Sequence, residues 1–211
     1  MKTVILGDSF AQSYRDTWFE LVSKKLSLNI KLQKGFSGGC EFFIYEEFIN
    51  FLKKQTCELV IFCHTEPQRL ANPDKIGINA NTAFQLSSTL PQQLISAAQA
   101  YYTHLYYEPF HNTIHNLLIQ DLQNICLKQN IKQIHFRSFN HPVSMLHGMW
   151  LQEDLHSIAA KSSPDYFQNY SLRNHFTPQQ HQQFAYEVLP LMQEYINGNF
   201  DCKVYTLTNS I

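Results

Sequence analysis

The sequence lacks the features that mark nucleic-acid-binding and membrane-spanning proteins. Its 16 basic and 17 acidic residues nearly cancel, leaving a formal net charge of -1. There is therefore no strong positive field to favour nucleic acid or an anionic membrane surface. No apolar run approaches the roughly 20 residues that a membrane-spanning helix needs. We therefore expect no nucleic-acid partner and no membrane span.

The amino terminus also lacks the features of a signal peptide. Only Lys2 and a four-residue apolar stretch precede Asp8, which is too short for the apolar region of a secretory signal. We therefore expect a cytoplasmic protein.

Cysteines are few, odd in number and never arranged as CxxC. We expect five reduced thiols rather than a disulfide framework or a zinc knuckle. His111 and His115 are four residues apart and would share one face of a helix, but no third ligand follows at a suitable spacing. The sequence predicts no metal and no organic cofactor.

The 211 residues read as one domain, 1–211, because no repeat or low-complexity linker divides them. Apolar runs predict strands near residues 3–6 and 59–63, and alternation of apolar and polar residues predicts one near 28–32. Residues 131–136 are read as a fourth strand. Helical spacing predicts helices near residues 14–26, 43–54, 92–128 (with a break near Pro109) and 178–196. Alternating strands and helices predict a three-layer α/β/α sandwich with a mostly parallel sheet and flavodoxin-like topology.

Gly7-Asp8-Ser9 lies directly after the first predicted strand. In open α/β sheets, ligands bind at the carboxyl ends of the strands. A serine there becomes a nucleophile if a base lies within hydrogen-bond reach. The alternative is an ordinary turn, in which Asp8 anchors the loop by accepting nearby backbone N–H groups.

His175 is the candidate base at the other end of the chain. It comes just before a well-marked helix start, where Thr177 is a suitable N-cap, Pro178 fits the first turn and Gln180 completes a capping box. Loops held by rigid elements often carry catalytic side chains. The alternative role for His175 is a hydrogen bond within its own loop.

Together these segments resemble the SGNH (GDSL-type) hydrolase family across nearly the whole chain. Gly7-Asp8-Ser9-Phe10 matches the family's nucleophile motif. In Gly35-Phe36-Ser37-Gly38, Gly38 matches the glycine whose amide forms part of the oxyanion hole. The resemblance implies Ser9 as nucleophile, His175 as general base, and the amides of Ser9 and Gly38 as oxyanion donors.

The third family block departs from the usual Gly-x-Asn-Asp. This chain has Cys63-His64-Thr65-Glu66-Pro67-Gln68-Arg69, which resembles a divergent branch seen in viral relatives. Thr65 is the first candidate to replace the asparagine donor, and His64 is the second; a plain helix N-cap is the other reading of Thr65. Arg69 is a candidate for supporting the site or recognising an anionic group, and a salt bridge is its alternative. Losing one oxyanion donor lowers rates about 100- to 1000-fold, so this replacement matters.

The fourth block departs as well, because Leu172 stands where the family has the aspartate that orients the base. Asp165, Asp154 and Glu66 are candidate replacements, and a backbone carbonyl is another. The resemblance implies a serine esterase that acts on an O-acyl ester, often on a carbohydrate, without a cofactor. The alternative is a degenerate member that binds a glycan or a protein, or serves in a viral particle. A viral member would act in the virion or the host cytoplasm.

Overall fold

Six parallel strands form the centre of the computed structural model, which describes residues 1–12, 16–85, 90–161, 176–198 and 201–207. Every strand pair in these ranges is parallel, and the strand order is β2-β1-β3-β4-β5-β6. The strands are β1 (Lys2–Gly7), β2 (Asn29–Gly35), β3 (Leu59–His64), β4 (Lys132–Arg137), β5 (Gly148–Leu151) and β6 (Cys202–Tyr205).

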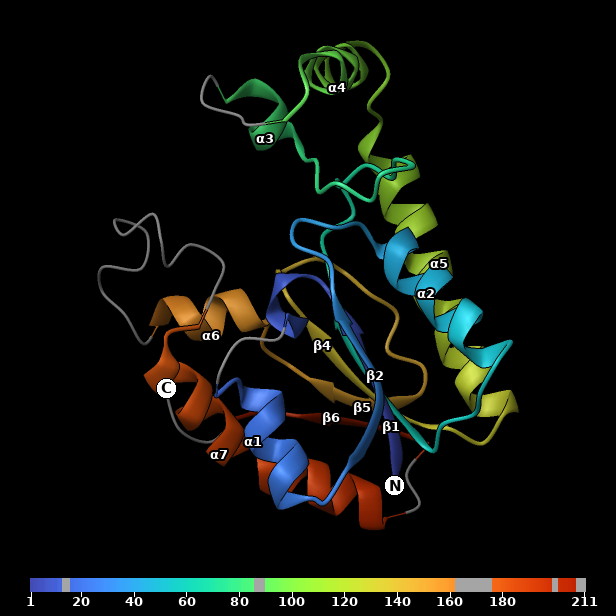
Figure 1. Ribbon diagram of the computed structural model, residues 1–211, viewed down its shortest axis with the longest axis vertical. Coiled ribbons are helices and arrows are strands. Elements are labelled where there is room, and N and C mark those ends of the chain that lie inside the picture. The colour runs from blue at the N-terminus through green and yellow to red at the C-terminus, as the bar shows by residue number, and fades with distance from the viewer. Residues whose placement is uncertain (13–15, 86–89, 162–175, 199–200, 208–211) are drawn as a thin grey trace.

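Helices cover both faces of this sheet (Figure 1). They are α1 (Trp18–Lys25), α2 (Glu41–Leu52), α3 (Ala80–Phe84), α4 (Gln92–His104), α5 (Glu108–Lys128), α6 (Leu155–Lys161) and α7 (Pro178–Asn197), with a short 3₁₀ turn, η1 (Ser9–Ala11). Helices α2 and α5 pack on one face, and α1, α6 and α7 pack on the other. Helices α3 and α4 stand beyond the carboxyl edge of the sheet (Figure 1).

The central strands are apolar on both faces because a helical layer covers each side. In β1, Val4 and Leu6 contact the α2–α5 layer, while Ile5 contacts the opposite layer. Strand β3 is buried along its whole length. The three-layer α/β prediction is therefore confirmed, and the strand order agrees with flavodoxin-like topology.

Several boundaries differ from those predicted. Helix α1 starts at Trp18, because Asp16 has a φ of 61° and the Glu20 carboxylate accepts the Thr17 N–H as a cap. Helix α2 starts at Glu41, two residues earlier than predicted. Strands β5 and β6 and helices α3 and α6 were not predicted, because each is at most seven residues long and shows too little periodicity to be recognised.

The predicted break near Pro109 is confirmed. Helix α4 ends at His104 and α5 begins at Glu108, with Pro109 in its first turn, where the missing N–H is tolerated. The capping box of α7 is also confirmed: the Thr177 hydroxyl accepts the Gln180 N–H, and the Gln180 side chain accepts the Thr177 N–H. None of the helices in the described ranges combines the length and apolarity required for crossing a bilayer.

We predict that Gly35→Ala destabilises the fold by about 1–3 kcal/mol. A Cβ at this position would lie 2.7 Å from both the Asp8 carbonyl oxygen and the Ala11 carbonyl carbon, so β2 must move away from the η1 turn. Urea unfolding of the variant measures this loss. The exposed Lys31→Ala on the same strand is the control, and equal stabilities of the two variants would contradict the prediction.

Candidate functional site

Three loops meet at the carboxyl edge of the sheet, after the neighbouring strands β2, β1 and β3. Gly7 pairs in register with Gly35 on one side and Cys63 on the other. The Phe36 N–H donates to the Gly7 carbonyl oxygen at 2.8 Å, and the Asp8 N–H donates to the Cys63 carbonyl oxygen at 3.3 Å. These bonds continue the strand pairing into the loops. The candidate residues Ser9, Gly38 and Thr65 therefore follow three adjacent strands.

The turn after β1 holds Ser9 in η1. One Asp8 carboxylate oxygen accepts the Phe10 N–H at 3.1 Å and the Ser138 hydroxyl at 2.8 Å, so Asp8 anchors the turn to the segment after β4. Ser9 itself is buried. Within the described part of the chain, neither its N–H nor its hydroxyl forms a hydrogen bond. Both groups are therefore unpaired at the strand end.

Gly38 occupies the third position of a turn closed by the Gly39 N–H donating to the Phe36 carbonyl oxygen at 2.8 Å. Its φ of 65° is left-handed, which favours glycine at this position of a turn. The backbone of Gly77 packs directly on Gly38, and a Cβ on Gly77 would lie 2.5 Å from the Ser37 carbonyl oxygen. Among the residues described, none accepts a hydrogen bond from the Gly38 N–H.

The backbone of Thr65 forms a hydrogen bond at both its N–H and its carbonyl oxygen. Its N–H donates to Glu41 Oε2 at 3.2 Å, and its carbonyl oxygen accepts from His115 Nε2 at 3.0 Å. Its hydroxyl oxygen is fully buried and has no hydrogen-bond partner in the described ranges. A buried hydroxyl without a partner is unfavourable, and a ligand oxygen would relieve that cost. Thr65 lies in a loop and does not cap a helix.

Arg69 connects three segments of this edge. Its Nε donates to Glu66 Oε1 at 2.9 Å, and its Nη1 donates to the Gly39 carbonyl oxygen at 3.4 Å. Nη1 also lies 3.8 Å from Asp8 Oδ2, and the guanidinium carbon lies 4.9 Å from the centre of the Phe139 ring. Arg69 is therefore engaged in a buried ion-pair cluster behind the Ser9 turn.

His64 lies in a buried chain of hydrogen bonds that sequence reasoning missed. Its Nδ1 is 2.8 Å from Glu41 Oε1, and its Nε2 is 2.8 Å from His135 Nδ1. His135 Nε2 is 3.0 Å from Gln133 Oε1, and the Gln133 amide nitrogen donates to the Gln123 carbonyl oxygen. The rings of His64 and His135 stack between Phe62 and Trp150.

The order of donors in this chain occupies both ring nitrogens of His64. Because Gln133 Oε1 can only accept, His135 carries its proton on Nε2, and its Nδ1 must accept from His64 Nε2. Burial lowers the pKa of His135 well below its usual value, which keeps that ring neutral. His64 Nδ1 is bonded to Glu41 Oε1. His64 therefore has no N–H left for an oxyanion, which leaves Thr65 as the candidate donor in this block.

Glu41 is the buried partner of His64. Burial alone would raise the pKa of the Glu41 carboxyl, but His64, His115 and the Thr65 N–H together hold it below its usual value. Glu41 Oε1 lies 2.8 Å from His64 Nδ1, and both side chains are almost completely shielded from solvent.

The carboxylates that could orient a base have partners of their own. Asp154 accepts the N–H and the hydroxyl of Ser157 at the start of α6. Glu66 binds Arg69, Gln68 and Asn79. The remaining candidates for the base and its orienting group, His175, Asp165 and the Leu172 position, lie outside the described residues.

The histidines that suggested a shared helix face do not approach a metal-binding arrangement. His111 contacts the Tyr101 hydroxyl and the Pro67 carbonyl oxygen, while His115 contacts Thr65. In the described ranges, no group of three or more His, Cys, Asp or Glu side chains could hold a metal ion.

The fold is similar to that of solved esterases. A psychrotrophic esterase, EstA, from a Pseudoalteromonas species aligns over 93% of this chain and 99% of its own length, with 12% identity and a TM-score of 0.52. An acetyl xylan esterase, AlAXEase, aligns over 98% of this chain and 77% of its own, with 12% identity and a TM-score of 0.42. A G-D-S-L family protein from Desulfitobacterium hafniense aligns over 88% of this chain and 95% of its own length, with 16% identity and a TM-score of 0.36. The sequence matches no protein-family model and no curated protein. At this level of identity, the likeness to EstA establishes the fold and not the activity.

We predict that Asp8→Asn changes the free energy of unfolding, relative to the wild type, more favourably at pH 8 than at pH 4. Burial raises the pKa of Asp8 from 3.8 to about 6, although Arg69, Ser138 and the Phe10 N–H oppose the rise. The folded state thus holds this proton more tightly, and its stability falls as the pH rises from about 4 through 6. The loss amounts to about 2–3 kcal/mol. Urea unfolding at both pH values measures the difference between wild type and variant.

The exposed Asp74→Asn is the matched control for this measurement. It should follow the wild-type dependence of unfolding free energy on pH. An Asp8→Asn variant with the wild-type dependence would contradict a raised pKa for the Asp8 carboxyl.

We predict that Glu41→Gln destabilises the protein by about 3–5 kcal/mol, because it removes the buried carboxylate that bonds both His64 and the Thr65 N–H. Glu46→Gln, on the same helix but partly exposed in its ion pair with Lys75, should lose less than about 1 kcal/mol. Urea unfolding measures both losses, and equal losses would contradict a structural role for the buried Glu41 carboxylate.

Proposed function

We propose that this chain is a serine esterase of the SGNH type that hydrolyses an O-acyl ester. Ser9 is the nucleophile and His175 is the general base. The N–H groups of Ser9 and Gly38 and the hydroxyl of Thr65 stabilise the oxyanion. Asp8, His64 and Arg69 support the site, and the reaction uses no metal or organic cofactor.

The observation that carries this proposal is the set of unpaired donors at one sheet edge. Two backbone N–H groups and one hydroxyl follow three adjacent strands and have no hydrogen-bond partner in the described ranges. Ser9 and Thr65 are buried, and the great majority of buried polar groups are paired, so unpaired donors at both residues are unusual. An oxyanion hole requires donors that are fixed before the substrate arrives and are not already occupied.

The chemistry follows from these groups. Ser9 Oγ attacks the acyl carbon as His175 takes its proton, and the carbonyl oxygen becomes an oxyanion beside the three donors. The bond to the alcohol then breaks, and His175 returns the proton to the leaving oxygen. Water attacks the acyl-Ser9 ester by the same steps and releases the acid. Because the Thr65 side chain is fully buried, a substrate oxygen can accept from its hydroxyl only after the side chains around it move.

The likeness in fold to EstA supports an esterase rather than another α/β enzyme, and EstA was solved with monoethylphosphonate as inhibitor. An organophosphorus probe therefore suits the test. We predict that a fluorophosphonate adds once to the wild type, as measured by intact mass, and does not add to Ser9→Ala. His175→Ala should react about 100- to 10,000-fold more slowly, which is the usual contribution of a general base.

Ser37→Ala is the matched control, because this serine is exposed in the neighbouring turn and should not affect labelling. Circular dichroism checks that each variant is folded. No adduct on the folded wild type would favour the alternative, a degenerate protein that binds a glycan or a protein partner. Labelling that persists in Ser9→Ala would place the nucleophile elsewhere.

A further inference from the structure

One stripe of α5 exposes apolar side chains to solvent from the start of the helix to its middle. It begins at the N-cap residue and continues at spacings of three, four and three residues, through Tyr107, Phe110, Ile114 and Leu117. Each of these side chains is between 42 and 64% exposed. The residues that α5 buries lie on another face of the helix, so the stripe is directed away from the sheet.

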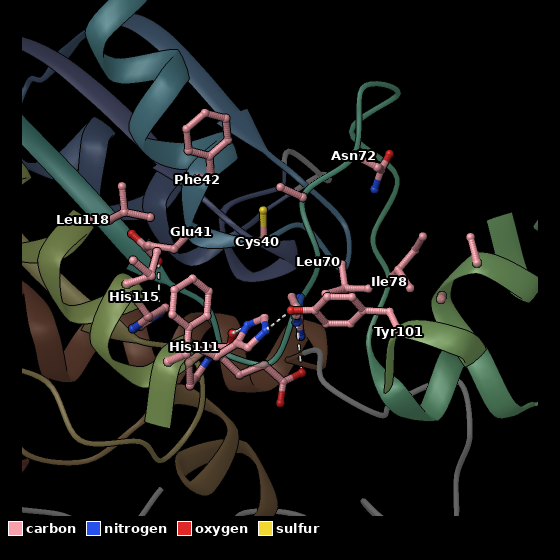
Figure 2. Close-up of a pocket in the computed structure, with 18 of the residues that line it drawn as sticks. Cys40, Glu41, Phe42, Leu70, Asn72, Ile78, Tyr101, His111, His115 and Leu118 are labelled. Atoms are coloured by element: carbon pink, nitrogen blue, oxygen red, sulfur yellow. Dashed lines mark hydrogen bonds and ion pairs between the residues drawn. The ribbon is translucent and has the colours of Figure 1, made fainter. Parts of the chain in front are cut away.

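Helix α2 extends this apolar surface. Phe42 is 45% exposed and, with Phe110 and Ile114, lines a pocket of about 450 Å³ between α2, α4 and α5. Figure 2 shows Phe42 on the α2 side of this pocket and Leu118 on its α5 side. Because the exposed residues of the two helices border the same hollow, they form one surface. We call it the α2–α5 patch, which consists of Phe42, Tyr107, Phe110, Ile114 and Leu117.

The patch carries no charge until the stripe reaches Asp121. Its later positions are polar as well, at Asn124 and Lys128. The Tyr45 hydroxyl donates to Asp121 Oδ2 at 2.7 Å, whereas Oδ1 accepts no hydrogen bond from the residues that the structure describes. An uncharged, aromatic-rich patch beside a polar rim is the composition of an interface core.

The exposed area of the patch is sufficient for contact between two copies of the chain. An aromatic side chain removes about 150–250 Å² from water when it is fully buried, so the exposed fractions of the five residues leave about 500 Å² of mainly apolar surface. A patch of this size on one protein is often functional. Two such patches packed together bury about 1,000 Å², which is the lower limit for a specific interface.

The stripe is complementary to itself about Ile114. In an antiparallel pair of α5 helices with Ile114 on a two-fold axis, Phe110 of each copy lies opposite Leu117 of the other. Tyr107 and Asp121 are each seven residues, about 10 Å, from Ile114 on opposite sides, so each tyrosine lies opposite an aspartate. The Tyr107 hydroxyl can then donate to the free oxygen of Asp121. The two aspartates are about 20 Å apart in this arrangement, which makes their repulsion small.

We propose that a second copy of this chain docks on the α2–α5 patch, with the two α5 helices antiparallel about Ile114. The second copy covers the mouth of the pocket that Phe42, Phe110 and Ile114 border. Because the buried area is near the lower limit, the dissociation constant of the dimer should be about 1–100 µM. This dimer does not depend on the proposed reaction.

Leu117→Glu tests the proposal, and Leu127→Glu is its matched control. The two leucines are 54 and 51% exposed on the same helix, but Leu127 lies outside the patch. Sedimentation equilibrium at about 5 to 200 µM, which brackets a micromolar dissociation constant, should show monomer and dimer for the wild type and for Leu127→Glu. Leu117→Glu should weaken the dimer at least about tenfold, because it places a charge in the apolar contact.

Circular dichroism checks that each variant is folded. A wild type that stays monomeric throughout this range would overturn the self-association and leave the patch to a different partner. A dimer that Leu117→Glu does not weaken would show that the copies meet at another surface, which would also overturn the proposal.

Cysteine cross-linking tests the antiparallel register. Among the native cysteines, Cys202 is exposed and the other four are buried, so each variant also carries Cys202→Ser. Ile114→Cys should form a disulfide between two copies when copper phenanthroline oxidises the two thiols, because the axis brings position 114 of both copies together. Leu127→Cys, treated in the same way, should remain a monomer on a non-reducing gel. A dimer in solution without a cross-link through Ile114→Cys would overturn the register.

Discussion

The buried carboxylate of Glu41 is the group on which the arrangement of the sheet edge depends. It starts α2, bonds His64 at the end of β3 and accepts the Thr65 N–H. Burying a carboxylate costs several kcal/mol, so Glu41 contributes mainly through its position. Because its hydrogen bonds restrict where the carboxylate can lie, Glu41 fixes α2 relative to the loop after β3. The stacked rings of His64, His135 and Trp150 extend that constraint across β3, β4 and β5.

Sequence patterns predicted the fold well where burial is uniform or the helix ends are marked. Strands β1 and β3 contain apolar runs covered on both faces, β4 is almost entirely buried, and α7 begins with a complete capping box. The misses have physical reasons. Strands β5 and β6 have four residues each, which is too short for a pattern, and β6 is largely exposed. The early start of α2 was missed because Glu41 is a charged residue whose burial depends on partners far away in the sequence.

The candidate site was only partly predictable. Motifs identified Ser9, Gly38 and Thr65 individually, and the parallel sheet brings their strands together. No local pattern pointed to Glu41 or His115, because their roles arise from contacts with Thr65 that span 24 and 50 positions of the chain. A usable signal existed in His64, which ends the apolar run of β3, and in His135, which lies between Ile134 and Phe136. A polar group in a strand covered on both faces needs a partner at hydrogen-bond distance. A buried histidine in the sequence thus shows that a partner is needed, but it does not identify the residue that acts as the partner.

Glu41 and His115 bond the backbone of Thr65 on both sides. These bonds give a physical reason why a threonine can serve, in the proposed reaction, where the family that the sequence resembles has asparagine. Asparagine reaches an oxyanion through a longer side chain with two rotatable bonds, whereas the threonine hydroxyl depends on the backbone and a single χ1 angle. The backbone of Thr65 is bonded at both its N–H and its carbonyl oxygen. Its branched Cβ restricts χ1 further. In the proposed reaction, a short donor with fixed direction requires a backbone that does not move, and the bonds to Glu41 and His115 hold the Thr65 backbone in place.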